Sequence, residues 1–338
     1  MRAERSTVRT LSAVMLAAVV GLAGCSAAPG EQAADTPDIA PVPVIDRATQ
    51  PLQASPTITD PHGQRVSLPK APERIVCLSG LCDDMLVELG MTPAGTSNPA
   101  LLIHPALMGE QGKAVPAVQG SFGSEDIESI AALKPDLVIG LSGVHDSLRP
   151  AIEGFAPLWL TEPVNWQESV EYLRNLGSLT GRTEQAMAAE TAFRAKLADA
   201  VQATRDSGQV RQKVVLMYGS AESIGVDTSD SLKGDLLAQL FTYPFPARGA
   251  DVETASNYSV EELLAKQPDV ALVYSLLFSP EDRTLSAQLA ENPVWKQIPA
   301  VQGQQVHEVH AKLFGSGRGT RSMAAIIDAS LKLVPAPR

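Results

Sequence analysis

The sequence predicts an α/β protein of two similar lobes, each a mostly parallel sheet covered by helices, joined by one long helix. Three observations predict this fold: apolar strands that alternate with amphipathic helices, a repeated segment, and an unbroken helical stretch between the two copies. With 338 residues, of which 44% are apolar, the chain is long enough for two domains with cores of their own.

The first residues predict a lipoprotein signal peptide over residues 1–25. A basic start precedes an apolar run over residues 11–22, about 18 Å of helix, which is too short to cross a bilayer core of about 30 Å. The run ends in Leu22-Ala23-Gly24-Cys25, which resembles the bacterial lipobox, so Cys25 is the expected lipidation site. Residues 26–56 are rich in Ala, Pro, Asp, Gln and Thr without any period, which indicates a disordered tether.

The N-terminal lobe is expected over residues 57–182. Residues 57–69 predict a hairpin, because Asp60-Pro61-His62-Gly63 is turn chemistry between short alternating strands. An apolar strand is predicted at residues 74–79, followed by a helix over residues 83–90 that a glycine closes. Such strands and helices indicate a parallel sheet covered on both faces.

Cys77 and Cys82 are the cysteines that remain after the proposed anchor, and they flank the predicted strand-to-helix turn. At such a turn both are more usually small buried residues. An exported protein could oxidise them, so the sequence leaves a disulfide open.

An internal repeat marks the two lobes. Residues 126–138 match residues 259–271 without a gap, at an offset that Glu128 and Glu261 illustrate (261 − 128 = 133). Both copies begin with a capping residue, continue with an apolar helix face and end in Pro-Asp before a strand. The repeat therefore predicts a second lobe of the same construction, over residues 207–334.

Residues 183–206 predict the link between the lobes. They contain many Ala, Glu, Lys and Arg residues and neither Gly nor Pro, which favours one uninterrupted helix of roughly 33 Å. Because a helix resists bending, closure of the lobes on a ligand is expected to be small.

Several short segments follow one another in an order that, taken together, is specific to one family of proteins. They are Pro72-Glu-Arg-Ile-Val76, Leu89-Gly-Met-Thr-Pro-Ala-Gly-Thr96, the first copy of the repeat, residues 292–303 and Gly315-Ser-Gly-Arg318. The set resembles the helical-backbone (class III) substrate-binding proteins of ABC importers for ferric siderophores, haem and cobalamin. The family often has Ser-Pro-Ser or Ser-Pro-Asn at its first turn, where this chain has Ser79-Gly80-Leu81-Cys82-Asp83, so the ligand stays open.

The resemblance implies a monomeric extracytoplasmic receptor, lipid-anchored to the outer face of the cytoplasmic membrane. It would capture a ferric siderophore or related iron chelate in the cleft between the lobes and deliver it to an ABC permease dimer, without a cofactor. The alternatives are a zinc or manganese receptor, a cobalamin or haem receptor, and a scaffold of the cell envelope without transport. The net charge of −11 argues against a nucleic-acid partner.

Ligands of open α/β lobes bind beyond the carboxyl ends of the strands, so the loops there should line the cleft. Arg318 and then Arg321 are the first candidates, because a guanidinium offers a planar fork of donors to an anionic chelate. Either arginine could instead cap or pair on the last helix. Tyr218 and Phe314 are the favoured aromatic contacts, since each is predicted beside glycine at a strand end. The other candidates are Lys312, Ser79, Ser121, Trp166, Tyr258, Tyr274 and Phe278, whereas Trp159 and Trp295 are assigned to packing.

Glu128 and Glu261 occupy the same place in the two copies, on the polar face of the first helical turn. The resemblance implies that they dock onto basic pockets of the permease dimer. The helix dipole alone stabilises glutamate there by about 0.3–1 kcal/mol, so a structural role without a partner is the alternative.

Metal and catalytic chemistry have little support in the sequence. The five histidines, at positions 62, 104, 145, 307 and 310, are not spaced to bring three ligands together, so no direct bond to a metal is expected. The chain has no dinucleotide, P-loop, nucleophile-elbow or zinc-protease motif, so we expect no enzymatic activity.

Overall fold

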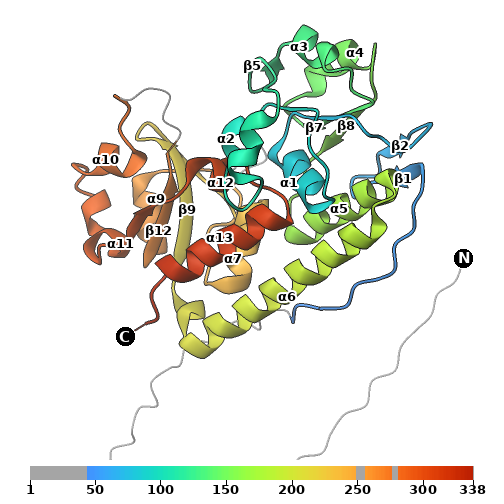
Figure 1. Ribbon diagram of the computed structural model, residues 1–338. Coiled ribbons are helices and arrows are strands. Elements are labelled where there is room, and N and C mark those ends of the chain that lie inside the picture. The colour runs from blue at the N-terminus through green and yellow to red at the C-terminus, as the bar shows by residue number, and fades with distance from the viewer. Residues whose placement is uncertain (1–43, 249–255, 276–280, 338) are drawn as a thin grey trace, which may run out of the picture. The chain divides into compact units, whose positions relative to one another are not determined.

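The computed structural model describes residues 44–248, 256–275 and 281–337 (Figure 1). The expected signal peptide, Cys25 and the tether up to residue 43 lie outside the described residues, as does Phe278. None of the described helices is both long and apolar enough to span a membrane.

The predicted hairpin is present as strands β1 (Thr57–Thr59) and β2 (Arg65–Ser67). The Asp60 carboxylate accepts the backbone N–H groups of His62 and Gln64, and Gly63 adopts a positive φ of 82°. Asp60 and Gly63, two of the residues from which the turn was predicted, therefore stabilise it.

Four parallel strands form the sheet of the N-terminal lobe, in the order β4-β3-β7-β8. Alternate residues point to opposite faces: Ile75 and Leu137 pack under helices α1 and α5, whereas Val76 and Val138 pack under α3 and α4. The prediction of a parallel sheet covered on both faces is confirmed for this lobe. The strands are β3 (Ile75–Cys77), β4 (Gly95–Thr96), β7 (Leu137–Leu141) and β8 (Leu158–Thr161), and the helices are α1 (Gly80–Glu88), α2 (Pro99–Leu102), η1 (Gly109–Ala114), α3 (Ile127–Ala132), η2 (Asp146–Leu148), α4 (Arg149–Ile152) and α5 (Trp166–Thr180).

The C-terminal lobe has a five-stranded sheet in the order β11-β10-β9-β12-β13. Strands β9, β12 and β13 are parallel, but β10 runs antiparallel to β9, because the short turn between them cannot make the crossover that a parallel pair needs. The strands are β9 (Val214–Ser220), β10 (Ser223–Val226), β11 (Asn257–Tyr258), β12 (Val270–Tyr274) and β13 (Val306–Glu308), and the helices are η3 (Gln209–Arg211), α7 (Leu232–Leu240), α9 (Val260–Lys266), α10 (Leu285–Leu289), η4 (Trp295–Gln297), α11 (Pro299–Gln302), α12 (Ala311–Ser316) and α13 (Thr320–Leu333).

The internal repeat folds into equivalent units. Asp126 caps α3 and Ser259 caps α9, each through its side chain. Each helix is followed, within two residues, by a residue with a positive φ, 49° at Lys134 and 51° at Gln267, which are again 133 positions apart (267 − 134). A left-handed residue before Pro-Asp turns the chain from helix to strand in both lobes.

The Pro-Asp aspartates have equivalent tasks as well. Asp136 accepts the backbone N–H of Arg74, just before β3, and Asp269 accepts that of Lys213, just before β9, at 2.9 and 2.8 Å. Each carboxylate ties its own strand to the neighbouring one. The segments that open the two lobes, just before β3 and β9, are therefore structurally equivalent as well.

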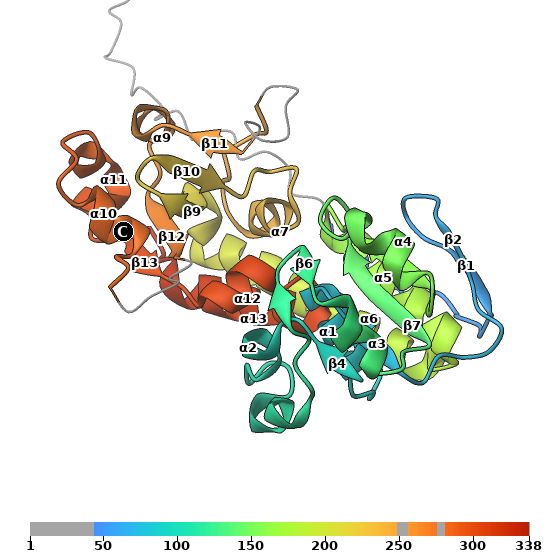
Figure 2. The ribbon, with the colours of Figure 1, turned by 90° about the horizontal axis from the view of Figure 1, so that it is seen from above.

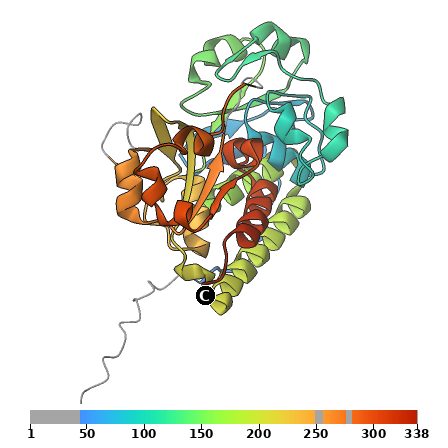
Figure 3. The same ribbon diagram turned by 90° about the vertical axis from the view of Figure 1, so that its left-hand side faces the viewer.

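Helix α6 (Thr183–Ser207) is the predicted link and runs beneath both lobes, with α13 beside it (Figures 1 and 3). The segment before β1 corrects the expectation of an unpacked tether up to residue 56. Arg174 of α5 donates to the carbonyl of Gln50, and Arg194 of α6 donates to that of Asp46. The chain from residue 46 onward therefore lies against these two helices.

Candidate functional site

The carboxyl ends of β9 and β12 form the topological switch point of the C-terminal lobe, which is where open α/β sheets bind ligands. The rings of Tyr218 and Tyr274, a directly paired couple on these strands, stack with centroids 5.0 Å apart and planes at 18°. Tyr218 also lines an open pocket of about 520 Å³ that reaches the β9–β10 turn and Ser275. Pockets of this size suit small ligands.

An acid–base pair lies beside the tyrosines. Asp227, which follows β10, accepts a hydrogen bond of 2.9 Å from the Tyr274 hydroxyl, and its other carboxylate oxygen lies 3.7 Å from Nζ of Lys233. The Lys233 side chain, in the first turn of α7, is only 6% exposed. Burial lowers the pKa of Lys233 to about 8, although Asp227 acts in the opposite direction.

Arg318 lies where the two lobes meet. Its backbone carbonyl accepts the hydroxyl of Ser169, on α5 of the N-terminal lobe, at 2.7 Å. Burial lowers the pKa of Arg318, and the carboxylates of Asp227 and, from the other lobe, of Glu162 act in the opposite direction. The guanidinium is therefore near carboxylates of both lobes.

The phenols of this cluster remain protonated. Burial raises the pKa of Tyr218, and it raises the pKa of Tyr274 well above its ordinary value. The cluster of Tyr218, Tyr274, Asp227, Lys233 and Arg318, called the cleft cluster below, thus combines aromatic rings with both signs of charge.

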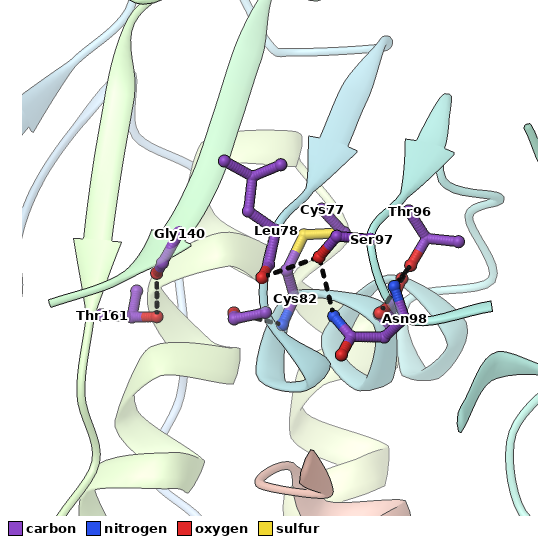
Figure 4. The surroundings of a disulfide bond; sticks show 10 residues. Cys77, Leu78, Cys82, Thr96, Ser97, Asn98, Gly140 and Thr161 are labelled. Carbon is purple, nitrogen blue, oxygen red and sulfur yellow. Dashed lines mark hydrogen bonds between the residues drawn. A yellow bond between two sulfur atoms is a disulfide. The ribbon is translucent and has the colours of Figure 1, made fainter. Parts of the chain in front are cut away.

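The corresponding edge of the N-terminal lobe holds a disulfide between Cys77, at the end of β3, and Cys82 of α1 (Figure 4). The turn between them is buried: Ser79 is 2% exposed, and its hydroxyl accepts the backbone N–H of Cys82 as the cap of α1. Ser79, one of the expected ligand contacts, is thus a buried helix cap. It also corrects the preference for two separate buried thiols, and α1 begins at Gly80 rather than at residue 83.

Polar side chains at the neighbouring strand ends bond to the protein itself (Figure 4). The Ser97 hydroxyl donates to the carbonyl of Leu78 at 3.0 Å and accepts from the Asn98 amide at 3.1 Å. The Thr161 hydroxyl donates to the carbonyl of Gly140 at 3.0 Å. These hydrogen bonds stabilise the strand ends.

Arg321 belongs to the contact between the lobes and not to the cleft cluster. Its Nε donates to the Glu88 carboxylate of α1 at 3.0 Å, and Thr320 donates to the other oxygen of Glu88 at 2.8 Å. The ion pair is the alternative role that the sequence left open for Arg321, whose side chain is 39% exposed.

Close approach of the backbone makes this contact possible. A Cβ atom on Gly319 would lie 2.3 Å from the Asp84 carboxylate, and one on Gly80 would lie 2.2 Å from the carbonyl oxygen of Ser316. Any larger residue at these two positions would push the lobes apart, so both must be glycine.

Two of the expected aromatic contacts, Phe314 and Trp166, have their side chains in the core. Phe314 is 1% exposed and packs in the C-terminal lobe. Trp166 is 4% exposed, its ring is 6.1 Å from that of Phe193, and the Arg194 guanidinium lies over it. Trp166 is the first residue of α5, whereas Phe314 lies inside helix α12 and not at the predicted strand end; both side chains point inward.

The remaining candidates have mixed positions. Lys312 is exposed on α12, and Ser121 is exposed on β5 (Gly120–Ser121), which forms a small hairpin with β6 (Ser124–Glu125). Tyr258 is buried beneath Arg248, whose guanidinium lies 4.1 Å from its ring. Trp159 and Trp295 are buried, as predicted.

Glu128 and Glu261 lie in the first turns of α3 and α9, as the repeat predicted, and both are exposed. Within the described part of the chain, neither forms an ion pair. Their carboxylates are therefore accessible at equivalent places on the two lobes.

The histidines are dispersed. His145 is buried, whereas His104 and His310 come together across the lobes, with ring centroids 4.8 Å apart. Among the described residues, no three His, Cys, Asp or Glu side chains are arranged to hold a metal ion.

Sequence reasoning did not single out Asp227 and Lys233. Asp227 follows a short apolar run at residues 224–226, which was the available signal of a strand end. Lys233 had no comparable signal, because a lysine in a helix is most often on a solvated face.

A family model described as periplasmic binding protein matches residues 75–313, more than half of the chain. The Fe(3+) dicitrate-binding periplasmic protein FecB of Escherichia coli (strain K12) is 25% identical over 284 residues, which cover 82% of this chain and 89% of that protein. A cobalamin-binding protein of Halobacterium salinarum is 26% identical over 283 residues, which cover 78% and 70% of the two chains.

Among solved structures, the periplasmic catecholate-siderophore binding protein VctP of Vibrio cholerae has a TM-score of 0.63 with this chain at 18% sequence identity. The match covers 81% of this chain and 99% of that one. At this level of identity the likeness shows the fold, and the predicted arrangement of two helix-covered sheets joined by a long helix is confirmed.

Proposed function

We propose that the substrate of this chain is a ferric siderophore or a related iron chelate. The chain belongs to the periplasmic binding protein family and is a substrate-binding protein of an ABC transporter. The family consists of binding proteins, in agreement with the expectation that the chain is not an enzyme. We also propose where the substrate binds and how the receptor docks onto its permease.

The cleft cluster is the observation that carries the proposal. It lies at the switch point of the C-terminal lobe and combines stacked tyrosines with the cations of Lys233 and Arg318. An iron chelate presents oxygen atoms and flat organic groups, for which guanidinium, ammonium and aromatic rings are the matching partners.

The metal itself would be held by its own organic shell. The cleft cluster has no histidine or cysteine, burial keeps the phenols of Tyr218 and Tyr274 protonated by raising their pKa, and the carboxylate of Asp227 is already engaged by Tyr274 and Lys233. The charge-transfer bands of the ferric complex should therefore be unchanged on binding. Bands of histidine-coordinated iron would contradict this part of the proposal.

Delivery to a permease would use Glu128 and Glu261. Their exposure at equivalent places of the two lobes suits a partner with a basic pocket for each lobe. The double variant Glu128→Gln and Glu261→Gln should bind chelate like the wild type but stimulate transport at least tenfold less in reconstituted vesicles. Unchanged transport would leave the two glutamates with only a helix-dipole role.

The anchor is a separate part of the proposal. Cys25 stands in a lipobox-like sequence, and we infer that it carries diacylglycerol. Mass spectrometry of the chain from membranes should find a lipid-modified N-terminal cysteine, and Cys25→Ala should release the protein from the membrane. A membrane-bound Cys25→Ala chain would contradict lipidation at this residue.

The central test is a titration of the full-length chain in detergent with ferric siderophores, ferric citrate, haemin, cobalamin and zinc, followed by tyrosine and tryptophan fluorescence. Saturable binding of an iron chelate that Arg318→Ala weakens about 10- to 100-fold is expected, because a charged hydrogen bond contributes about 1.5–3 kcal/mol. Arg321→Ala is the matched control, since that arginine pairs with Glu88 and should leave affinity nearly unchanged.

Other outcomes favour the alternatives. Saturation by cobalamin or haemin alone would assign the chain to those ligands, and saturation by zinc alone would assign it to metal reception. Flat titrations for every compound would refute chelate binding and favour a scaffold role in the cell envelope.

A further inference from the structure

The hairpin of β5 and β6 holds an aromatic ring in solvent. Phe122, in its turn, is 63% exposed, the highest exposure of any aromatic side chain among the described residues. Folding gains little from a phenyl ring that stays in water, so burial in the fold does not explain this side chain.

The structure fixes this hairpin firmly. His145, in the loop after β7, accepts the backbone N–H of Leu141 at Nδ1, so its Nε2–H donates to the Glu125 carboxylate at 3.1 Å. Glu125 and His145 are buried, and the edge of the Phe122 ring contacts the imidazole at a centroid distance of 5.6 Å. Phe122 is thus presented by a rigid support, so a ligand would lose little entropy in ordering it.

The hairpin is also in the right place. It lies on the side of the N-terminal lobe that is turned toward the C-terminal lobe, in two perpendicular views (Figures 1 and 2). His145 follows β7, so the hairpin belongs to the carboxyl edge of its sheet, as Tyr218 and Tyr274 belong to that of the other sheet. Ser121, a predicted ligand contact, is beside Phe122 on the same hairpin.

Charge in the cleft cluster is balanced. The Asp227 carboxylate lies 3.7 Å from Nζ of Lys233, and Asp227 and Glu162 both act on the charge of Arg318. The two cations therefore face two anions, and a strongly anionic chelate would meet carboxylates as well as cations without an excess of positive charge.

We propose that the cleft selects an iron chelate that carries aryl groups and little net charge, and that Phe122 is its aromatic contact on the N-terminal lobe. The inference rests on the proposed function and narrows its substrate class. Rings of the chelate would lie between Phe122 on one side and the Tyr218–Tyr274 stack on the other, while Arg318 and Lys233 donate to its oxygens.

A matched pair of complexes isolates the aryl group. The tris(benzohydroxamate) and tris(acetohydroxamate) complexes of chromium(III) have the same neutral core and differ only in phenyl against methyl, and chromium(III) exchanges its ligands slowly enough to keep both intact. Calorimetry with the full-length chain should give at least about tenfold tighter binding of the phenyl complex.

Variants assign the preference to the hairpin. Phe122→Ala should reduce the ratio of the two affinities to within about twofold, whereas Phe155→Ala, which removes a 39% exposed ring elsewhere on the same lobe, should leave it unchanged. Glu125→Ala should lower the ratio and speed hydrogen exchange of residues 120–125. Glu125→Gln, which keeps an acceptor for the imidazole, should restore both.

The outcomes separate this inference from the proposed function. Equal affinities for the two complexes, a ratio unchanged in Phe122→Ala, or tighter binding of ferric citrate than of the phenyl complex would overturn the aryl preference and leave chelate binding intact. Absence of binding for every iron chelate, ferric citrate included, would refute the proposed function and this inference together.

Discussion

The carboxylate of Asp84, on α1 of the N-terminal lobe, accepts the backbone N–H of Ser322, in the first turn of α13, at 2.7 Å. Its other oxygen accepts the N–H of Arg321 at 3.1 Å, so Asp84 supplies to α13 the cap that Gly319 cannot supply. The lobes are therefore joined by this contact as well as by α6. A second joint is a further reason to expect small closure on ligand.

Removing the cap should destabilise the protein. Asp84→Ala deletes a buried acceptor and leaves two helix N–H groups unpaired, so the free energy of unfolding should fall by about 2–4 kcal/mol in a urea titration. Glu171→Ala, which truncates an exposed carboxylate in the middle of α5, is the control and should change it by less than about 0.5 kcal/mol. A loss in Asp84→Ala no larger than the control's would show that the cap is dispensable.

The same carboxyl group should make stability depend on pH. Burial, and then repulsion from Glu88, raise the pKa of Asp84 to about 6, above its unfolded value of about 3.9. The fold thus favours the neutral form, so this stabilisation is fully present below pH 4 and is lost as the pH rises through 6, about 3 kcal/mol in all.

The variant that tests this dependence is Asp84→Asn, which keeps an acceptor but cannot titrate. Its free energy of unfolding should fall less than that of the wild type between pH 4 and 7. Some slope should remain, because burial also raises the pKa of the neighbouring Asp83. Parallel curves for wild type and variant would contradict the role of Asp84.

Binding should weaken at alkaline pH. Burial holds the pKa of Lys233 at about 8, so its ammonium loses its proton as the pH rises from 7 to 9. If the ammonium donates to the bound chelate, affinity should drop about tenfold over this interval. Calorimetry on Lys233→Met should give weaker and nearly pH-independent binding, whereas the exposed Lys332→Met should follow the wild type; a wild-type affinity that does not change with pH would count against contact with Lys233.

The disulfide should stabilise the fold by a modest amount. It closes a loop of only a few residues between Cys77 and Cys82, for which chain entropy predicts about 2 kcal/mol. The double variant Cys77→Ala and Cys82→Ala should lose that much in urea titration while still binding chelate. Because both cysteines are fully buried, a mild reductant should leave the native protein unchanged. Rapid reduction of the native protein would contradict the buried position.

Positions of the functional side chains depended on contacts between residues far apart in the chain. Arg321 and Glu88, which are 233 residues apart, form an ion pair between the lobes. Trp166 is the first residue of α5, but its ring turns toward Phe193 of α6. The position of a residue at the end of a helix or strand predicts the region of the fold in which it lies. The direction of its side chain depends instead on the residues that pack against it.

The sequence by itself determined the features that rest on local patterns. The hairpin turn at residues 60–63, the uninterrupted α6 and the duplicated helix–strand units follow from turn chemistry, helix propensity and apolar period, which neighbouring residues set. Only the tertiary structure decided that Asp227 and Lys233 lie in one cluster with Arg318, that Ser79 is buried in the turn between the disulfide-bonded Cys77 and Cys82, and that Asp84 caps the last helix. Burial, distance and desolvation arise from packing, so no local pattern encodes them.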